Sequence, residues 1–97
     1  MSASGLPVQL SVPADPRFRT LVLSMTRRIA ESVGLSTGEA EALGDEVADQ
    51  ASAAVRQAGA DPATLVDVTF DLAGSRLRVR ATCRGASFEV LRALPAA

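Results

Sequence analysis

The stretch from Ser36 to Gly59 constrains the fold most, because its residue pattern is typical of one long amphipathic helix. Ser36 followed three residues later by Glu39 fits a capping box, in which each side chain accepts from the backbone N–H of the other residue. Gly59 can take the left-handed conformation that ends a helix. Apolar residues recur between these ends at steps of three and four, namely Ala40, Leu43, Val47, Ala51, Ala54 and Ala58. Such a narrow stripe of small residues predicts a helix lying close against a sheet.

A second line of residues runs beside this stripe at helical spacing and contains Glu46 and Gln50. If the chain has a functional site, we expect it along this line. Asp45, Glu46 and Asp49 form an acidic cluster, but residues 45 and 46 project about 100° apart on a helix. The cluster therefore lacks the geometry of a metal site, and the pattern favours solvated helix carboxylates over a catalytic base.

The residues before this helix predict a strand and another helix. Apolar and other residues alternate from Leu6 to Val12, which is typical of a half-buried strand, and Pro7 indicates an edge or strand-entry position. Asp15 is expected to cap a first helix from Pro16 to about Val33. Its predicted buried stripe is Phe18, Leu21, Val22, Met25, Ile29 and Val33. The short connection makes the two helices antiparallel neighbours, and Gly44 is expected to allow close packing.

A β-hairpin is predicted after the helices. One strand carries Val66, Val68, Phe70 and Leu72 on one face, and the next carries Leu77, Val79, Ala81 and Cys83. With the turn at Gly74, Leu72 faces Leu77, so Asp71 lies opposite Arg78 and Asp67 opposite Thr82. Cross-strand acid–arginine neighbours contribute roughly 0.2–1 kcal/mol each, and a one-residue slip would put arginines into the core. The tail, residues 85–97, fits either a last strand or an irregular flap.

The predicted order is strand, helix, helix, strand, strand, with a possible last strand. This order predicts one α+β domain over residues 1–97, a two-layer sandwich with two helices on one face of a small antiparallel sheet. A fraction of 47% apolar residues suffices for a core in a chain of 97 residues.

The composition excludes several classes of function. A net charge of −1 gives no reason to expect nucleic acid or an anionic membrane as a partner. The absence of histidine removes the commonest general base and metal ligand. The one cysteine, Cys83, forms no internal disulfide, and its apolar neighbours favour a small core residue over a redox thiol. Residues 1–7 lack the pattern of a signal peptide, and no apolar run is long enough for a membrane span, so we expect a cytoplasmic protein.

Several short segments resemble one bacterial family. Four segments are similar to the anti-sigma-factor serine kinases, namely 10–14, the start of the second helix at Leu35-Ser36, 44–51 and 83–88. These enzymes belong to the histidine-kinase-like ATPases of the GHKL superfamily, which share the Bergerat fold. The resemblance extends from about Leu6 to Phe88. The family's domains usually continue into an ATP lid and further strands, and this chain stops before them.

The resemblance implies a role for each matching residue. Glu46 matches the family's glutamate, which activates the attacking hydroxyl or water, and Gln50 occupies the position of an asparagine that ligates Mg²⁺. The adenine-reading aspartate is replaced by Cys83. In the glycine box that follows, Gly85 matches the first glycine, Ser87 replaces the second, and the aromatic position is retained as Phe88.

The replaced residues predict that the nucleotide site is vestigial. A glutamine displaces a ligand by one methylene, which octahedral Mg²⁺ tolerates poorly, and a thiol is a weak hydrogen-bond acceptor. We therefore expect no cofactor and no kinase activity. The alternative is an ATP- and Mg²⁺-dependent serine kinase with atypical ligands, in which Glu46 is catalytic and Gln50 reaches the metal. A small α+β protein that merely shares this element order is a third interpretation.

A stripe of arginines along one strand is the candidate partner surface: Arg76, Arg78, Arg80 and Arg84. No aromatic residues interleave to stack bases, so nucleic acid is disfavoured. A charged outer sheet face is the simplest interpretation, followed by an acidic protein partner. The resemblance then implies a non-catalytic regulatory module that binds a sigma factor, an anti-anti-sigma protein or a related kinase. Unpaired strand edges make a homo-oligomer an additional expectation.

Overall fold

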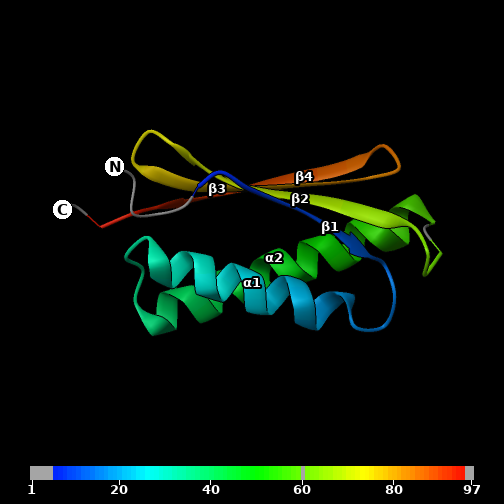
Figure 1. The fold of residues 1–97 in the computed structure, drawn as a ribbon, viewed down its shortest axis with the longest axis horizontal. Coiled ribbons are helices and arrows are strands. Elements are labelled where there is room, and N and C mark those ends of the chain that lie inside the picture. The colour runs from blue at the N-terminus through cyan, green and yellow to red at the C-terminus, as the bar shows by residue number, and fades with distance from the viewer. Residues whose placement is uncertain (1–5, 60, 96–97) are drawn as a thin grey trace.

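A computed structural model describes residues 6–59 and 61–95, so the parts of the predictions that concern residues 1–5, 60 and 96–97 lie outside it. The elements are β1 (Val8–Pro13), α1 (Phe18–Ser32), α2 (Thr37–Ala58), β2 (Leu65–Ala73), β3 (Arg76–Cys83) and β4 (Ala86–Ala93). Both helices lie on one face of the sheet (Figure 1). The predicted two-layer α+β fold is confirmed. Within the described residues, neither helix has the length and apolar character needed to cross a bilayer.

The sheet is antiparallel throughout, with strands in the order β1-β2-β3-β4. The predicted hairpin register is confirmed, because Leu72 pairs with Leu77, Asp71 with Arg78 and Asp67 with Thr82. The tail, whose conformation the sequence leaves open, forms β4 and pairs along β3. A two-residue turn connects these strands, with φ of 49° at Arg84 and 89° at Gly85. Positive φ at both central residues suits the twist of a tight hairpin, although arginine rarely adopts it.

The ends of α2 agree with the prediction. The backbone N–H of Glu39 donates to the Ser36 hydroxyl at 3.2 Å, and the N–H of Ser36 donates to Glu39 Oε1 at 3.0 Å. This donation by the Ser36 backbone lowers the pKa of Glu39. Gly59 ends the helix with φ of 63°. The capping box forms because it satisfies two backbone donors that the first helical turn leaves without intrahelical partners.

The start of α1 differs from the prediction. The helix begins at Phe18 rather than Pro16, and its N-cap is Arg17, whose side chain makes no capping hydrogen bond. Asp15 instead forms a turn before the helix. Its Oδ1 accepts from the N–H of Arg17, and its carbonyl accepts from the N–H of Phe18, both at 2.9 Å. Asp15 was wrongly predicted as the cap, because the same side chain can stabilise either a turn or a helix start.

The buried face of α1 is rotated from the predicted one. Leu21 is 45% exposed, whereas Thr26 and Ala30 are completely buried. The reason is α2, which packs along one flank of α1. A Cβ added at Gly44 would lie 3.2 Å from the carbonyl oxygen of Leu23, so Gly44 does allow the helices to approach closely. The core between helices and sheet is centred on Phe70, Leu43, Leu77 and Val47, all with 0% exposure.

Thr26 allows a stability prediction, because its buried hydroxyl has no hydrogen-bond partner within the described part of the chain. Replacing Thr26 with valine removes this polar group at nearly constant volume and helix propensity. We expect the free energy of unfolding to rise by about 1 kcal/mol, measured by urea denaturation. Thr20→Val, at an exposed position on the same helix, is the control and should change stability by less than about 0.5 kcal/mol. A loss of stability in Thr26→Val alone would contradict the prediction.

Candidate functional site

The second line of α2 meets the sheet through an ion pair. Glu46 and Gln50 are both half-buried, and Gln50 Nε2 donates to Glu46 Oε2 at 3.5 Å. The guanidinium of Arg92, on β4, donates to Glu46 Oε1. The side chains of Arg92 and Glu46 are 38% and 40% exposed. Both carboxylate oxygens are therefore occupied by protein groups at the rim between α2 and β4.

Arg92 is a residue of the candidate site that the sequence analysis did not identify. The register of β4 with β3 places every second residue of β4 opposite a helix-facing residue of β3: Ala86 pairs with Cys83, Phe88 with Ala81, Val90 with Val79 and Arg92 with Leu77. Leu77 and Val79 are fully buried, so Arg92 starts from the helix-facing side of the sheet. Its long stem carries the charge to the rim, as long charged side chains commonly do. The two-residue alternation in 86–92 indicates which side of the sheet Arg92 starts from, but only if the tail is interpreted as a strand.

The residues matched to the glycine box belong to the β3–β4 hairpin and are divided among its helix-facing side, its turn and its opposite face. Cys83 is a free, buried thiol with 1% exposure on the helix-facing side. Gly85 is exposed in the turn, and a Cβ there would have no neighbour within 4 Å. Ser87 is exposed and pairs with Thr82, so it lies on the opposite face from Cys83. Phe88 is half-buried and pairs with Ala81 on the helix side.

Arg92, which binds Glu46, and the hairpin turn lie at opposite ends of β4. Arg92 is seven residues beyond Gly85 along an extended strand, and seven residues of strand span about 23 Å. Gln50 contacts Glu46 one turn further along α2. A shallow hollow exists elsewhere, on α1, lined by Ser24, Arg27, Arg28 and Glu31. We give this hollow no functional weight, because one helix supplies its whole lining.

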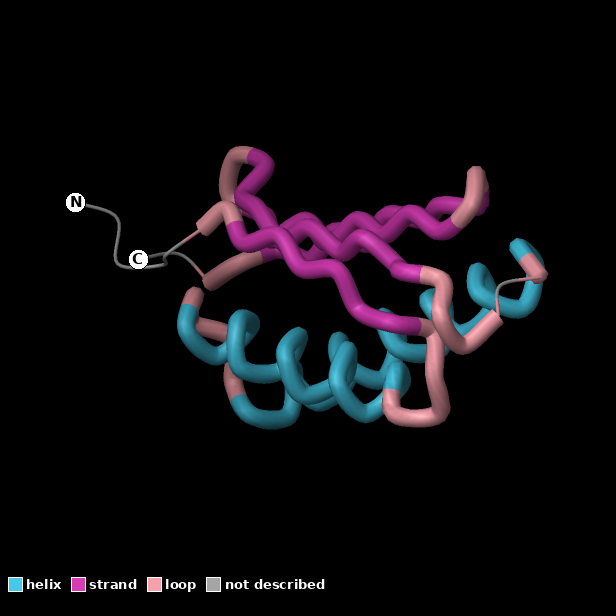
Figure 2. Tube along the Cα trace, turned by 45° about the vertical axis from the view of Figure 1, so that its right-hand side comes forward, coloured by secondary structure: helices cyan, strands magenta, loops and turns pink. Residues whose placement is uncertain are grey.

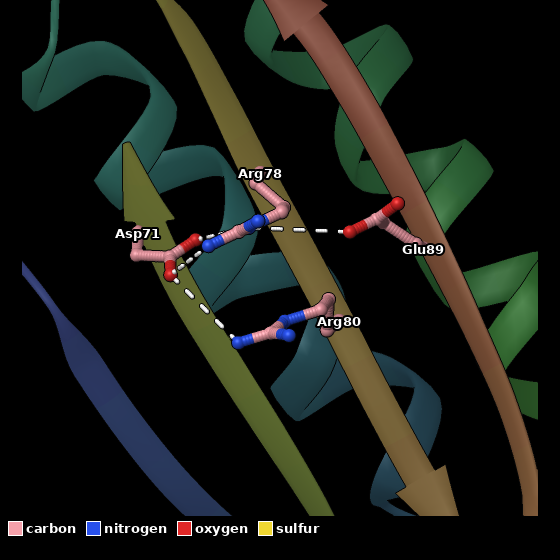
Figure 3. A network of polar contacts seen from close by, with 4 residues as sticks. All are labelled: Asp71, Arg78, Arg80 and Glu89. Atoms are coloured by element: carbon pink, nitrogen blue, oxygen red, sulfur yellow. Dashed lines mark hydrogen bonds and ion pairs between the residues drawn. The ribbon is translucent and has the colours of Figure 1, made fainter. Parts of the chain in front are cut away.

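The arginine stripe on β3 is partly neutralised by its own sheet. Arg78 forms a two-pronged contact with Asp71, with Nε 2.8 Å from Oδ1 and Nη2 2.7 Å from Oδ2. Arg78 also lies 3.9 Å from Glu89, and Arg80 lies 3.9 Å from Asp71 (Figure 3). The hydrogen bonds from Arg78 lower the pKa of Asp71, although partial burial opposes this shift. The same contact raises the pKa of Arg78.

The remaining arginines of the stripe are separated from one another. Arg76 begins β3, and Arg84 lies in the turn that follows its end. In the part of the chain that the structure describes, neither forms an ion pair. The stripe is therefore a central charge network flanked by two free cations rather than a continuous basic surface.

The network at Asp71 predicts a pH dependence. Because the pKa of Asp71 is lowered on folding, its contribution to stability is fully present above the unfolded pKa of about 3.9 and is lost as the pH falls through the folded pKa. We expect Asp71→Asn to flatten the loss of stability below about pH 4, measured by urea denaturation across the acid range. Arg78→Met should reduce the acid loss of stability by a similar amount, and the double variant should reduce it little further than either single variant. An unchanged acid slope in both single variants would contradict this result.

Comparison with known proteins assigns no family. No protein-family model matches the chain, and a search of curated proteins finds no match. Fold and site together define a class: a small two-layer α+β domain with a helix-covered sheet face, a charged open face and an ion pair at the rim between the layers.

Proposed function

We propose that this chain is a non-catalytic regulatory module that binds another protein, in the manner of a degenerate anti-sigma factor. The observation that carries the proposal is the use of the motif residues within the fold. Glu46 contacts both Gln50 and Arg92, while Gly85 is a turn residue at the far end of β4 from Arg92. The arginine that holds Glu46 is therefore separated from the glycine-box turn by the length of β4.

The open face of the sheet is the proposed partner surface. Both helices lie on the opposite face (Figure 2). Among the described residues, no helix or strand covers the outer side chains of the sheet. Arg76 and Arg84 lie on β3 and its turn without ion pairs among the described residues, and Arg80 is a weakly held neighbour of Asp71. Such cations favour a partner with an acidic surface. By the family resemblance, we propose a sigma factor, an anti-anti-sigma protein or a related kinase, met in the cytoplasm.

Nucleotide titration tests the non-catalytic part of this proposal. A ligand that binds only the folded state raises the melting temperature progressively once its concentration exceeds the dissociation constant, so Mg²⁺-ATP should leave the melting temperature unchanged. Gln50→Asn combined with Cys83→Asp should also fail to create binding, because Glu46, the partner of position 50, stays bound to Arg92 at the end of β4 remote from Cys83. A melting temperature of the unaltered chain that rises with Mg²⁺-ATP concentration would instead support the serine kinase with atypical ligands.

Binding to purified partners tests the remaining part. The host's sigma factors and anti-anti-sigma proteins can be titrated calorimetrically against the chain. Arg76→Glu and Arg84→Glu should each weaken the correct complex about fivefold, corresponding to about 1 kcal/mol for a charge at the rim of an interface. Arg56→Glu, at the end of α2 in the helix layer, is the matched control and should leave affinity unchanged. Equal losses of affinity in all three variants would show that the partner does not bind at the open face of the sheet.

A further inference from the structure

The free edge of β1 has backbone donors and acceptors that no other strand among residues 6–59 and 61–95 uses. The N–H of Ala14 donates to the carbonyl of Thr64 at 2.9 Å, and these residues continue the β1–β2 register. In an antiparallel pair, residues alternate between bonding to the neighbour and pointing away from it. Val8, Leu10 and Val12 therefore bond to β2, whereas Gln9 and Ser11 direct their N–H and carbonyl groups to the free edge.

The sequence of this edge is nearly symmetric about Leu10. Antiparallel pairing of two β1 strands with Leu10 opposite Leu10 places Val8 opposite Val12 and Gln9 opposite Ser11. Apolar residues then meet on the helix side, and polar residues meet on the open side. The residues that face each other with free backbone groups are Gln9 and Ser11, which is the requirement for a hydrogen-bonded pair. Pro13 has no N–H, so the pairing ends with the strand.

The flank of α1 beside this edge carries two apolar side chains, Leu21 and Met25, with the exposed Arg28 one turn further along the helix. α1 packs next to β1, whereas α2 packs against β3 and β4. Leu21 and Met25 lie about 160° around the helix from Leu23 and Arg27, the residues that α2 contacts at Gly44. The exposed Leu21 and the half-buried Met25 therefore lie on the same side as the free edge of β1. An apolar flank next to unused backbone donors is typical of an interface rather than a solvated edge.

The other edge of the sheet lacks these properties. The N–H of Leu94 donates to the carbonyl of Ser75, so Ser87, Glu89 and Leu91 direct their backbone groups outward from β4. This strand contains Glu89 and Arg92, and symmetric pairing about Val90 would place each Glu89 opposite a leucine. Charged residues on an edge strand oppose pairing with another chain. β1 contains no charged residue.

We propose that β1 pairs with β1 of a second copy of this chain, antiparallel about a two-fold axis at Leu10, so that the two sheets become continuous. Gln9 of each copy exchanges backbone hydrogen bonds with Ser11 of the other. On the helix-covered side of the sheet, the two α1 helices contact each other through the flanks that carry Leu21. This pairing does not rest on the proposed function, because it uses β1 and α1 rather than the arginines of β3.

Sedimentation of matched variants tests the pairing. The unaltered chain should sediment with about twice its mass of 10.0 kDa. Gln9→Pro removes an outward N–H from β1 and should give the single-chain mass, whereas Glu89→Pro removes the equivalent donor from β4 and should leave the dimer intact. Leu21→Glu should also give single chains, and Thr20→Glu, on the solvent side of α1, should not. A single-chain mass for the unaltered protein up to its solubility limit would overturn the proposal.

Amide hydrogen exchange of the unaltered chain provides a second test that does not depend on any variant folding. The amides of Gln9 and Ser11 should become more protected as protein concentration rises, while the outward amide of Glu89 should not. Exchange at Gln9 and Ser11 that is independent of concentration would overturn the proposal. The proposal would also be overturned if Glu89→Pro lost the dimer while Gln9→Pro and Leu21→Glu retained it.

Discussion

Replacing Phe70 with alanine should lower the free energy of unfolding by about 3–5 kcal/mol, the largest effect of any substitution considered for this chain. Phe70 lies on β2, is completely buried and is the largest of the fully buried side chains. It faces the helices from a strand that has neighbours on both sides, so the surrounding backbone cannot collapse into the space that alanine leaves. The loss combines the transfer of the ring to water with a cavity. Denaturation in urea measures it directly.

Phe88→Ala is the matched control for Phe70→Ala. It removes the same ring from the same face of the sheet, but from the edge strand β4, where the side chain is only half-buried. The hydrophobic contribution scales with the apolar area removed from water, so we expect about half the loss or less, about 1–2 kcal/mol. Equal losses in both variants would show that the core is not centred on β2.

Gly44→Val should destabilise the chain by about 1–3 kcal/mol through overpacking. A Cβ at Gly44 would already lie 3.0 Å from the Arg27 side chain and 3.2 Å from the backbone oxygen of Leu23. The Arg27 side chain can move, but the backbone of α1 moves only with its helix. Two further methyl groups at this position would therefore push α1 and α2 apart, and the core beneath them would lose contacts. Because the chain contains neither tryptophan nor tyrosine, chemical denaturation followed by far-ultraviolet circular dichroism would record the loss.

Gly38→Val makes the same chemical change in the first turn of the same helix. A Cβ at Gly38 would have no neighbour within 4 Å, so only helix propensity changes there. Valine is the better helix former, and we expect a change within about 0.5 kcal/mol, in the stabilising direction. If Gly44→Val were equally harmless, the close approach of the helices at Gly44 would be contradicted.

Local rules in the sequence accounted for the parts of the fold that short-range chemistry controls. The capping box at Ser36 and Glu39, the left-handed end at Gly59 and the register of Leu72 with Leu77 all depend on neighbours in sequence or on strict alternation. Asp15 failed as a cap because a turn and a helix start compete for the same carboxylate. β4 stayed undecided because Arg84 is an unusual residue at a position with positive φ, so the tight turn left no recognisable signal.

The candidate site illustrates the same limit. The sequence indicated that Glu46 and Gln50 share a line on one helix, and the structure confirms that they lie together. It did not indicate that Arg92 would reach them, because that contact depends on how β4 pairs with β3 and on which edge lies over α2. Nor did it show that Arg78 is held by Asp71 in two hydrogen bonds, although the opposite charges in register made their proximity predictable.

The sequence by itself determined both helices, the first three strands, their order and the inward faces of α2 and of those strands, because hydrophobic periodicity and capping act over a few residues at a time. Only the tertiary structure decided which flank of α1 is buried, which charges neutralise one another and which strand edges stay open. These features arise where elements distant in the chain meet. Their energies depend on distance and exposure, which no local pattern encodes.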